Sequence, residues 1–262
     1  MLPQEKLSIS VVSHGQAGLV ADLLDDLRRH CKTPIEIVLT LNLKETLPFA
    51  AEDFAFPVRI IENDVPKGFG ANHNAAFERV DSQFFCVLNP DVRLQSDIFP
   101  ALMEQLRAPR VAAVAPAIVG PGGEPEDSAR RFPTFLSILA KALTGSRGNA
   151  DYADRAVPFS PDWIAGMFML FRAEVFHELG GFDERYYLYY EDVDLCARLR
   201  HRDYQVCVVP EVCAVHYARR ESHRNIRYLL WHVKSLVRFL VTTARRRAGG
   251  AARNPRTTES IR

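Results

Sequence analysis

The chain has 262 residues, with 33 Lys and Arg, 32 Asp and Glu and a formal net charge of +1 at pH 7. This balance gives no general argument for a nucleic-acid partner. The hydrophobic fraction of 47% is that of an ordinary globular protein. The five cysteines show no metal-binding spacing, the N-terminus lacks signal-peptide features, and the longest apolar stretch, 163–171, falls short of the ~20 residues of a membrane-spanning helix. We therefore expect a reducing, cytoplasmic setting.

The first 120 residues alternate between apolar runs and helical patterns. Strands are predicted at 7–13, 35–41, 58–62, 83–88 and 111–115, and helices at 19–29, 71–79 and 98–107. This alternation favours an α/β fold with a doubly wound, mostly parallel sheet. Ligands of such sheets bind beyond the carboxyl ends of the strands, so we expect the turns there to face one crevice. These turns follow Ser13, Leu41, Glu62 and Leu88.

A stretch rich in glycine and proline, 120–127, separates this first half from a second half. A short helix is expected around 135–143, a strand at 163–171, helices at 173–179, 191–201 and 226–240, and extended pieces at 205–209 and 212–216. The arginine-rich residues after Thr243 are typical of a disordered segment. We therefore expect one domain over 1–218, a basic amphipathic helix within 219–243 and a disordered tail over 244–262.

The tripeptide Asn89-Pro90-Asp91 follows a fully apolar predicted strand, so its polar groups should emerge at the crevice. A carboxylate there can hold a divalent cation against a diphosphate, because hard cations take oxygen ligands and Mg²⁺ often bridges to substrate phosphates. Asn, Pro and Asp are also favoured in plain turns. The tripeptide alone leaves both interpretations open.

The loop 63–74 carries two glycines between a predicted strand and a predicted helix. Glycine allows the backbone to approach a ligand closely, and a helix start offers free N–H groups to anions. The loop is no Walker motif, and it matches the dinucleotide fingerprint incompletely, because His73 stands where the third glycine should be. An unspecific turn also explains it.

Three acids, Glu191, Asp192 and Asp194, open a predicted helix directly after a run of aromatic residues. Acids are stable at helix N-termini because they complement the helix dipole. Alternatively, one of them is a general base beside an aromatic wall. Acids crowded at one place need a cation or ligand to offset their charge, which favours function here. His216 ends a later extended run, and a lone histidine is more typical of a structural hydrogen bond than of a ligand.

Together these segments resemble the family 2 glycosyltransferases, and within them the rhamnosyltransferase-like group of bacterial O-antigen and cell-wall synthesis. The resemblance rests on ISVVSH, NDVPKGFGANHNAAF, FFCVLNPDV, WIAGMFMLFRAEVFHELGGFDERYYLYYEDVDLCARLR and VCVVPEVCAVHYA. These stretches come in the family's order over residues 8–218. Its most specific part is the combination of GGFDE, YEDVD and a later VPE followed by a histidine.

The resemblance implies a GT-A fold, with a nucleotide-sugar half at 1–120 and an acceptor half at 128–218. It implies an inverting transfer with Asp192 as general base and Glu191 beside it. Asp91 and His216 would bind Mg²⁺ or Mn²⁺, which neutralises charge on a departing nucleoside diphosphate. The implied donor-binding residues are Ser13, Asn42, Asn63, Lys67, Gly68, Gly70, Asn72, Asn89 and Asp91, and the implied acceptor-side residues are Trp163, Gly166 and Tyr190.

The resemblance further implies a dTDP- or UDP-sugar donor, above all dTDP-rhamnose, and a glycan or glycolipid acceptor. The basic C-terminal helix suits the anionic inner face of a bacterial plasma membrane, where each basic residue adds ~1 kcal/mol. A helix that packs on the core and exposes its arginines to water is the equal alternative. No nucleic-acid partner is implied.

The chain also departs from the family pattern. Relatives usually carry an aspartate after the second strand, where this chain has no acid before Glu45, although Thr40 or Asn42 can still bond a base. This motivates an alternative hypothesis, a non-catalytic sugar-nucleotide-binding assembly partner. A third hypothesis, a nucleotide-dependent oxidoreductase, is disfavoured by the missing third glycine and by the same missing acid.

Overall fold

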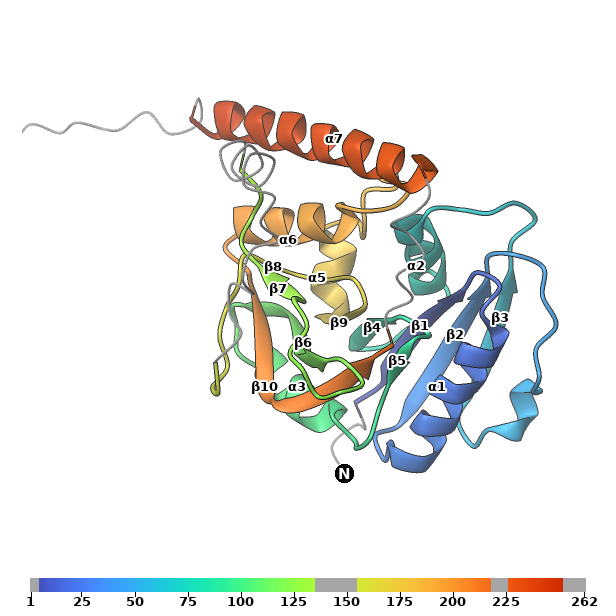
Figure 1. Cartoon of the computed structure of the whole chain (residues 1–262). Helices are drawn as coiled ribbons and strands as arrows, with labels where there is room; N and C mark the ends of the chain where they lie inside the picture. The colour runs from blue at the N-terminus through green and yellow to red at the C-terminus, as the bar shows by residue number, and fades with distance from the viewer. Residues whose placement is uncertain (1–4, 135–154, 218–225, 252–262) are drawn as a thin grey trace, which may run out of the picture.

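A computed structural model of the protein describes residues 5–134, 155–217 and 226–251 (Figure 1). Most of the described strands form one eight-stranded sheet with the order β3-β2-β1-β4-β9-β6-β10-β5. Its strands are β1 (Leu7–Ser13), β2 (Ile35–Leu41), β3 (Val58–Glu62), β4 (Phe84–Leu88), β5 (Val92–Arg93), β6 (Val111–Val119), β9 (Phe168–Arg172) and β10 (Gln205–His216). A separate ribbon pairs β7 (Ala129–Arg130) with β8 (Trp163–Ile164).

Strands β3, β2, β1 and β4 are parallel, and β10 is parallel to β6. The mostly parallel α/β sheet expected from the sequence is therefore confirmed. Two strands are exceptions: β9 runs antiparallel between β4 and β6, and β5 is antiparallel to β10. Strand β9 enters the sheet from the separate ribbon, because a short turn joins it to the end of β8.

Helices cover both faces of the sheet (Figure 1). They are α1 (Ala17–His30), α2 (Phe69–Phe77), α3 (Phe99–Leu106), α5 (Ala173–Glu178), α6 (Glu191–His201) and α7 (Ile226–Ala251), with a 3₁₀ turn at Ala51–Asp53. Strand β4 shows why a central strand of this sheet is apolar throughout. Cys86 faces the core beneath α1 and α3, while Phe85 faces the core beneath α5 and α6. A strand buried on both faces has no polar alternation.

The structure corrects several expected boundaries. The single strand expected at 163–171 is two strands, β8 and β9, separated by a turn at 165–167. The pieces expected at 205–209 and 212–216 join into β10, with a shift of register between Val209 and Cys213. The helix expected at 135–143 lies outside the described residues.

Helix α7 is longer than expected. It lies across the end of the molecule over α6 and runs to Ala251 instead of stopping near residue 240, so the disordered tail expected from 244 is wrong for 244–251 (Figure 1). The helix continues because Arg246 forms an ion pair with buried Asp194 and no proline intervenes before Pro255. Residues 252–262 lie outside the described part of the chain.

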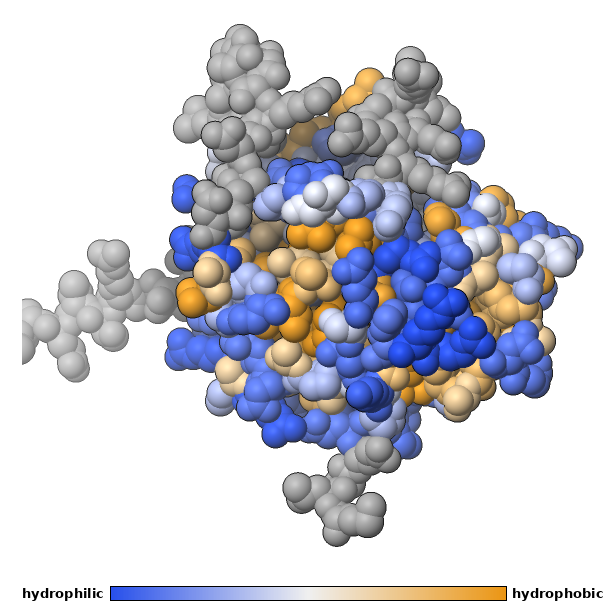
Figure 2. Space-filling view, turned by 60° about the horizontal axis from the view of Figure 1, so that its bottom comes forward, coloured by the Kyte–Doolittle hydropathy of each residue, from blue (hydrophilic) through white to orange (hydrophobic). Residues whose placement is uncertain are grey.

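The described surface mixes residue types. On the face turned forward in Figure 2, hydrophilic residues surround smaller hydrophobic patches. Among the described helices, none combines the length and the apolar character needed to pass through a bilayer.

Candidate active site

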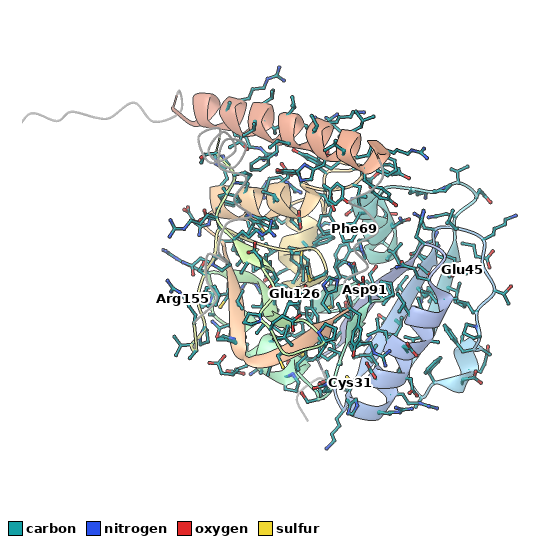
Figure 3. All side chains as sticks on the ribbon, in the orientation of Figure 1. Cys31, Glu45, Phe69, Asp91, Glu126 and Arg155 are labelled. Carbon is teal, nitrogen blue, oxygen red and sulfur yellow. The ribbon has the colours of Figure 1, made fainter. Side chains whose placement is uncertain are left out.

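Asp91 and His216 come together because β5 pairs with the last residues of β10, where His216 lies opposite Val92. The Nε2 atom of His216 is 3.5 Å from Oδ2 of Asp91, and the backbone N–H of Tyr217 donates to the Asp91 carbonyl at 2.9 Å. Two residues 125 positions apart in the chain thus share one corner of the sheet. Figure 3 shows Asp91 toward the middle of the molecule, near Glu126.

Glu126 is a site residue that the sequence did not reveal. Its Oε2 atom lies 2.7 Å from Nδ1 of His216, on the opposite side of the ring from Asp91. Carboxylates that hold the second nitrogen of a histidine fix its ring orientation and tautomer. Glu126 lies in the 120–127 stretch, which resembled a plain linker because it carries no periodic pattern.

The charge around His216 favours a cation. Burial lowers the pKa of His216, but its hydrogen bonds to Asp91 and Glu126 outweigh that effect and raise the pKa to about 9. The Oδ1 atom of Asp91 is buried and has no hydrogen-bond partner. An unpaired carboxylate oxygen beside an oriented histidine fits a divalent metal ion, which would take the place of the proton on the His216 ring because only the neutral ring is a ligand.

This corner offers two protein ligands and not a complete cation cage. Within residues 5–134, 155–217 and 226–251, no group of three or more His, Cys, Asp or Glu side chains converges as a metal site. Mg²⁺ is commonly held by one or two carboxylates and completed by water and substrate phosphates. Asp91 and His216 therefore suit a cation that arrives with a diphosphate.

The carboxylate of Asp192 lies at the start of α6 and is held by two backbone donors. Gly166 donates its N–H to Oδ2 at 3.0 Å, and Val193 donates to Oδ1 at 2.8 Å. Burial raises the pKa of Asp192, and these donors act against the rise. This carboxylate is partly exposed, its orientation is fixed, and its backbone donors limit the rise of its pKa. Such a group is suited to accept a proton.

Glu191 has a different environment from its neighbour. It is 5% exposed, and its Oε2 atom has no hydrogen-bond partner. Burial raises the pKa of Glu191 well above its ordinary range, and the charge of Asp192 adds to the rise. Burial therefore favours the protonated form of Glu191, while Asp192, whose oxygens accept two backbone N–H groups, is the better candidate for a base.

Asp194, the third acid of the same turn, has a structural role. Its side chain is fully buried and pairs with Arg198 at 2.7 Å and with Arg246 of α7 at 2.9 Å. The crowding of three acids thus has two separate explanations. Asp194 is neutralised by two arginines that pair with it directly, and only Glu191 and Asp192 remain for a functional explanation.

Two expected donor-binding glycines are explained by close packing of the protein on itself. A Cβ atom on Gly68 would lie 2.6 Å from the carbonyl oxygen of Tyr187, and one on Gly70 would lie 2.6 Å from Cβ of Phe182. The start of α2 therefore presses against the segment that precedes α6. His73, in place of a third glycine, is 1% exposed and bonds Ser10 at 2.8 Å, where burial lowers its pKa to about 3.

The expected donor-side asparagines form one hydrogen-bonded network. Asn63 donates to Oδ1 of Asn42 at 2.9 Å and to Oδ1 of Asn72 at 2.7 Å. Asn42 also accepts from the N–H of Lys67 and donates to its carbonyl, at 2.8 and 3.0 Å. Its amide further bonds His14. The turns after β1, β2 and β3 therefore meet as expected, and Asn42 is fully occupied in holding the Lys67 loop.

Glu45 brings an acid to the turn after β1. Its two carboxylate oxygens accept from the N–H groups of Gly15, at 3.2 Å, and Ala17, at 2.8 Å. Ser13, also expected at the donor side, is buried and accepts from the N–H of Gln16 at 3.1 Å. The chain thus lacks the aspartate after β2 but has a later acid, Glu45, whose carboxylate binds N–H groups at the start of α1.

A single turn connects the two candidate centres. Within residues 165–167, Gly166 contacts Asp192, and the carbonyl of Met167 accepts from the N–H of Asn89 at 2.9 Å. The expected acceptor-side residues also gather here: Trp163 and Tyr190 pack on a buried cluster that includes Phe239. The turn therefore links the Asp91 corner to the Asp192 carboxylate.

Comparison with known proteins decides the family. The model of glycosyl transferase family 2 matches residues 8–180, which is more than half of the chain. The chain belongs to this family. A second model, described as the N-terminal domain of galactosyltransferase, matches residues 154–224.

Curated relatives of this family 2 glycosyltransferase include two rhamnosyltransferases. The chain is 29% identical to the rhamnosyltransferase WbbL of Escherichia coli K12, over 88% of this chain and 91% of that protein. It is 27% identical to the N-acetylglucosaminyl-diphospho-decaprenol L-rhamnosyltransferase of Mycobacterium tuberculosis, over 89% of this chain and 83% of that protein.

Solved structures show the same fold at low sequence identity. GalNAc-T7, solved with UDP, GalNAc and Mn²⁺, has a TM-score of 0.68 at 16% identity, over 92% of this chain and 48% of that one. The mannosyltransferase PcManGT of Pyrobaculum calidifontis, solved with GDP-Man and Mn²⁺, has a TM-score of 0.61 at 16% identity, over 97% and 77%. The expected GT-A fold is therefore confirmed, although the chain spans only about half of the GalNAc-T7 chain.

Proposed function

We propose that this glycosyltransferase moves L-rhamnose from dTDP-rhamnose to a hydroxyl of a growing, lipid-linked glycan, with inversion at the anomeric carbon. Two relatives that it matches over most of its length are named rhamnosyltransferases, and one of them is named for a diphospho-decaprenol acceptor. The observation that carries the chemical part of the proposal is the Asp192 carboxylate, aimed by Gly166 and connected through one turn to the Asp91 corner.

In the proposed reaction, Asp192 removes the proton of the acceptor hydroxyl as the acceptor oxygen bonds to the anomeric carbon. The bond between that carbon and the diphosphate oxygen breaks on the opposite face, so configuration inverts and the nucleoside diphosphate leaves. Glu191 keeps its proton and leaves a single negative charge at the start of α6. The backbone donors to Asp192 hold its carboxylate in one orientation for the acceptor hydroxyl.

Asp91 and His216 are proposed to hold Mg²⁺ or Mn²⁺, with Glu126 fixing the histidine ring. When bound, the cation supplies positive charge against the negative charge that develops on the departing diphosphate. The protein's own share is to keep the carboxylate and the imidazole in place, through the β5–β10 pairing and the Glu126 contact.

We further propose that the outer side of α7 touches an anionic membrane surface at the inner face of the plasma membrane. Residues 226–251 contain six basic and no acidic residues. One side of the helix exposes Leu229, Leu230, Val233, Val237 and Val241. A helix with an exposed apolar row and flanking cations suits the interface of a bilayer that contains anionic lipids.

The membrane proposal is tested with vesicles of phosphatidylglycerol and phosphatidylcholine. The wild-type chain should sediment with anionic vesicles and lose this property at high salt. The variant Leu230→Ser/Val233→Ser/Val237→Ser should stay in the supernatant with an unchanged far-UV spectrum. Equal sedimentation of the two proteins would refute the proposal.

The catalytic proposal is tested by nucleoside diphosphate release. Purified protein is given dTDP-rhamnose, UDP-glucose or UDP-GlcNAc with Mn²⁺ or Mg²⁺, with and without a GlcNAc-diphospho-polyprenol acceptor. Acceptor-dependent release from dTDP-rhamnose alone supports the full proposal, and release from a UDP-sugar assigns a different donor. Binding of dTDP-rhamnose without turnover of any donor favours the non-catalytic assembly partner.

A further inference from the structure

The two residues directly before the Glu191-Asp192 pair have an unusual backbone. Tyr189 has a φ of +70° and Tyr190 a φ of +68°. Residues other than glycine, asparagine and aspartate rarely adopt this left-handed conformation, because their Cβ atom crowds the backbone. Two consecutive tyrosines in this conformation persist only where the surroundings hold them.

Helix α7 contacts this segment from one side and restrains it. Ser235 donates its hydroxyl to the carbonyl of Leu188 at 3.0 Å. His232 packs against the rings of Tyr189 and Tyr190, with centroids 5.4 and 5.3 Å away. Two further ring contacts lie on either side: Trp231 with Tyr187 at 4.8 Å and Phe239 with Tyr190 at 5.8 Å.

The same helix is also tied to α6 itself. Arg246 reaches the fully buried Asp194, which lies two residues after Asp192. From the other side, Phe69 at the start of α2 donates its N–H to the carbonyl of Tyr187 at 2.9 Å, and Gly68 lies directly against that residue. The segment 187–190 is therefore enclosed between α2 and α7.

We propose that the inner face of α7 is a positioning element for the base: it holds Tyr189 and Tyr190 in their left-handed conformation and so fixes the first turn of α6. If α7 releases this segment, the tyrosines can relax to ordinary φ values. The start of α6 then shifts, and the carboxylate of Asp192 loses its alignment with the N–H of Gly166. This inference rests on the proposed role of Asp192. It means that residues of α7 affect the reaction rate although they touch no reacting atom.

The test uses the full chain with the double substitution Ser235→Ala/Arg246→Met. We expect kcat to fall about tenfold or more, since small misplacements of a catalytic group are that costly. The Kd for dTDP should stay unchanged. The conservative variant Arg246→Lys, which keeps Ser235 and a positive charge beside Asp194, should have a kcat close to that of wild type. Ala244→Ser, an exposed substitution on the same helix, is the matched control and should behave as wild type.

Two readouts separate positioning from a loss of structure. In an Asp192→Asn background the double substitution should cause no further fall in rate, because there is no base left to misplace. Hydrogen exchange should accelerate at the amides of 187–193 and stay unchanged in β1, β2 and β4. Additive rate losses, or wild-type rates in the double variant, would overturn the proposal.

The exchange measurement keeps this inference apart from the proposed function. If wild-type protein turns over no donor, the transferase chemistry proposed above fails by itself. The hold of α7 on residues 187–190 is then still decided by exchange: unchanged protection of 187–193 in the double variant refutes it.

Discussion

The backbone N–H of Gly166 donates to Oδ2 of Asp192 at 3.0 Å, and it does so from a turn that separates two strands in different sheets. The space beside the same glycine is tight. A Cβ atom there would lie 3.1 Å from Cζ of Phe69 and 3.7 Å from Cβ of Asp192. Gly166 thus combines a hydrogen bond to the proposed base with close contact to α2.

Gly166→Ala should therefore lower kcat by roughly 10–100-fold, because the added methyl displaces Phe69 and tilts the Asp192 carboxylate. Binding of dTDP, measured by calorimetry, should change little. Gly18→Ala is the matched control, since nothing lies within 4 Å of a Cβ atom at that position in α1. An alanine at 166 with full activity would show that the hydrogen bond does not set the rate.

Asp192→Asn should lower kcat by about 10²–10⁴-fold, since an amide cannot take the acceptor proton. The exposed Asp203, two residues beyond the end of α6, is the control. Asparagine tolerates the left-handed backbone of this position, so Asp203→Asn should leave the rate unchanged. Single-turnover transfer to the lipid acceptor measures the effect. Comparable rates for the two variants would remove Asp192 from the mechanism.

Glu191→Gln should leave kcat within a few-fold of wild type, because burial favours the protonated form of the Glu191 carboxyl, which an amide resembles. It should also change the pH dependence of stability. A raised native pKa means that the folded state binds more protons than the unfolded state, so wild-type stability falls as pH rises above the unfolded value of ~4.3. The Glu191→Gln variant has no carboxyl group at this position and does not lose stability in this way. Its Tm should exceed that of wild type at pH 8 and approach it near pH 4; a constant difference would contradict the shifted pKa.

Glu126→Gln should weaken Mn²⁺ binding by about 10–100-fold, because loss of the carboxylate frees the His216 ring to turn. Electron paramagnetic resonance of free Mn²⁺, titrated in the presence of dTDP, measures binding independently of turnover. Glu124→Gln alters an exposed acid of the same loop and should bind Mn²⁺ as wild type does. Equal affinities for both variants would exclude Glu126 from the site.

Asn42→Asp should destabilise the protein by about 1–3 kcal/mol, although relatives were expected to carry an aspartate after this strand. The new carboxylate oxygen would face the carbonyl of Lys67, to which the asparagine now donates. Urea denaturation of this variant and of Gln95→Glu, an exposed substitution of the same kind, tests the prediction. Equal urea midpoints for the two variants would show that the asparagine network tolerates a negative charge at position 42.

The sequence predicted what depends on local pattern. The strands at 7–13, 35–41 and 58–62 have the expected bounds, because runs rich in β-branched residues between turn residues specify strands. It missed what depends on tertiary contact. The apolar residues from Trp163 to Phe171 read as one strand, since a single Gly166 gives little sign of a turn that joins two sheets.

The site divides in the same way. Asp91, Asp192 and His216 stood out through a motif, and the structure brings Asp91 and His216 together through strand pairing. Glu126 and Glu45 could not be found, because each acts through one long-range contact from a loop with no pattern. The role of Asp194 also needed the structure, since its partner Arg246 is 52 residues away on α7.

Strand β9, which belongs to the second half of the chain, is inserted between β4 and β6 of the first half. The two halves are consequently not exchangeable modules. A fragment that ends near residue 120 would keep β4 and β6 but leave the adjoining edge of each without its neighbour, and open edges of apolar strands pair with other chains. Chimaeras that join the first half of one transferase to the second half of another should therefore succeed only where β9 and its two flanking strands come from the same parent.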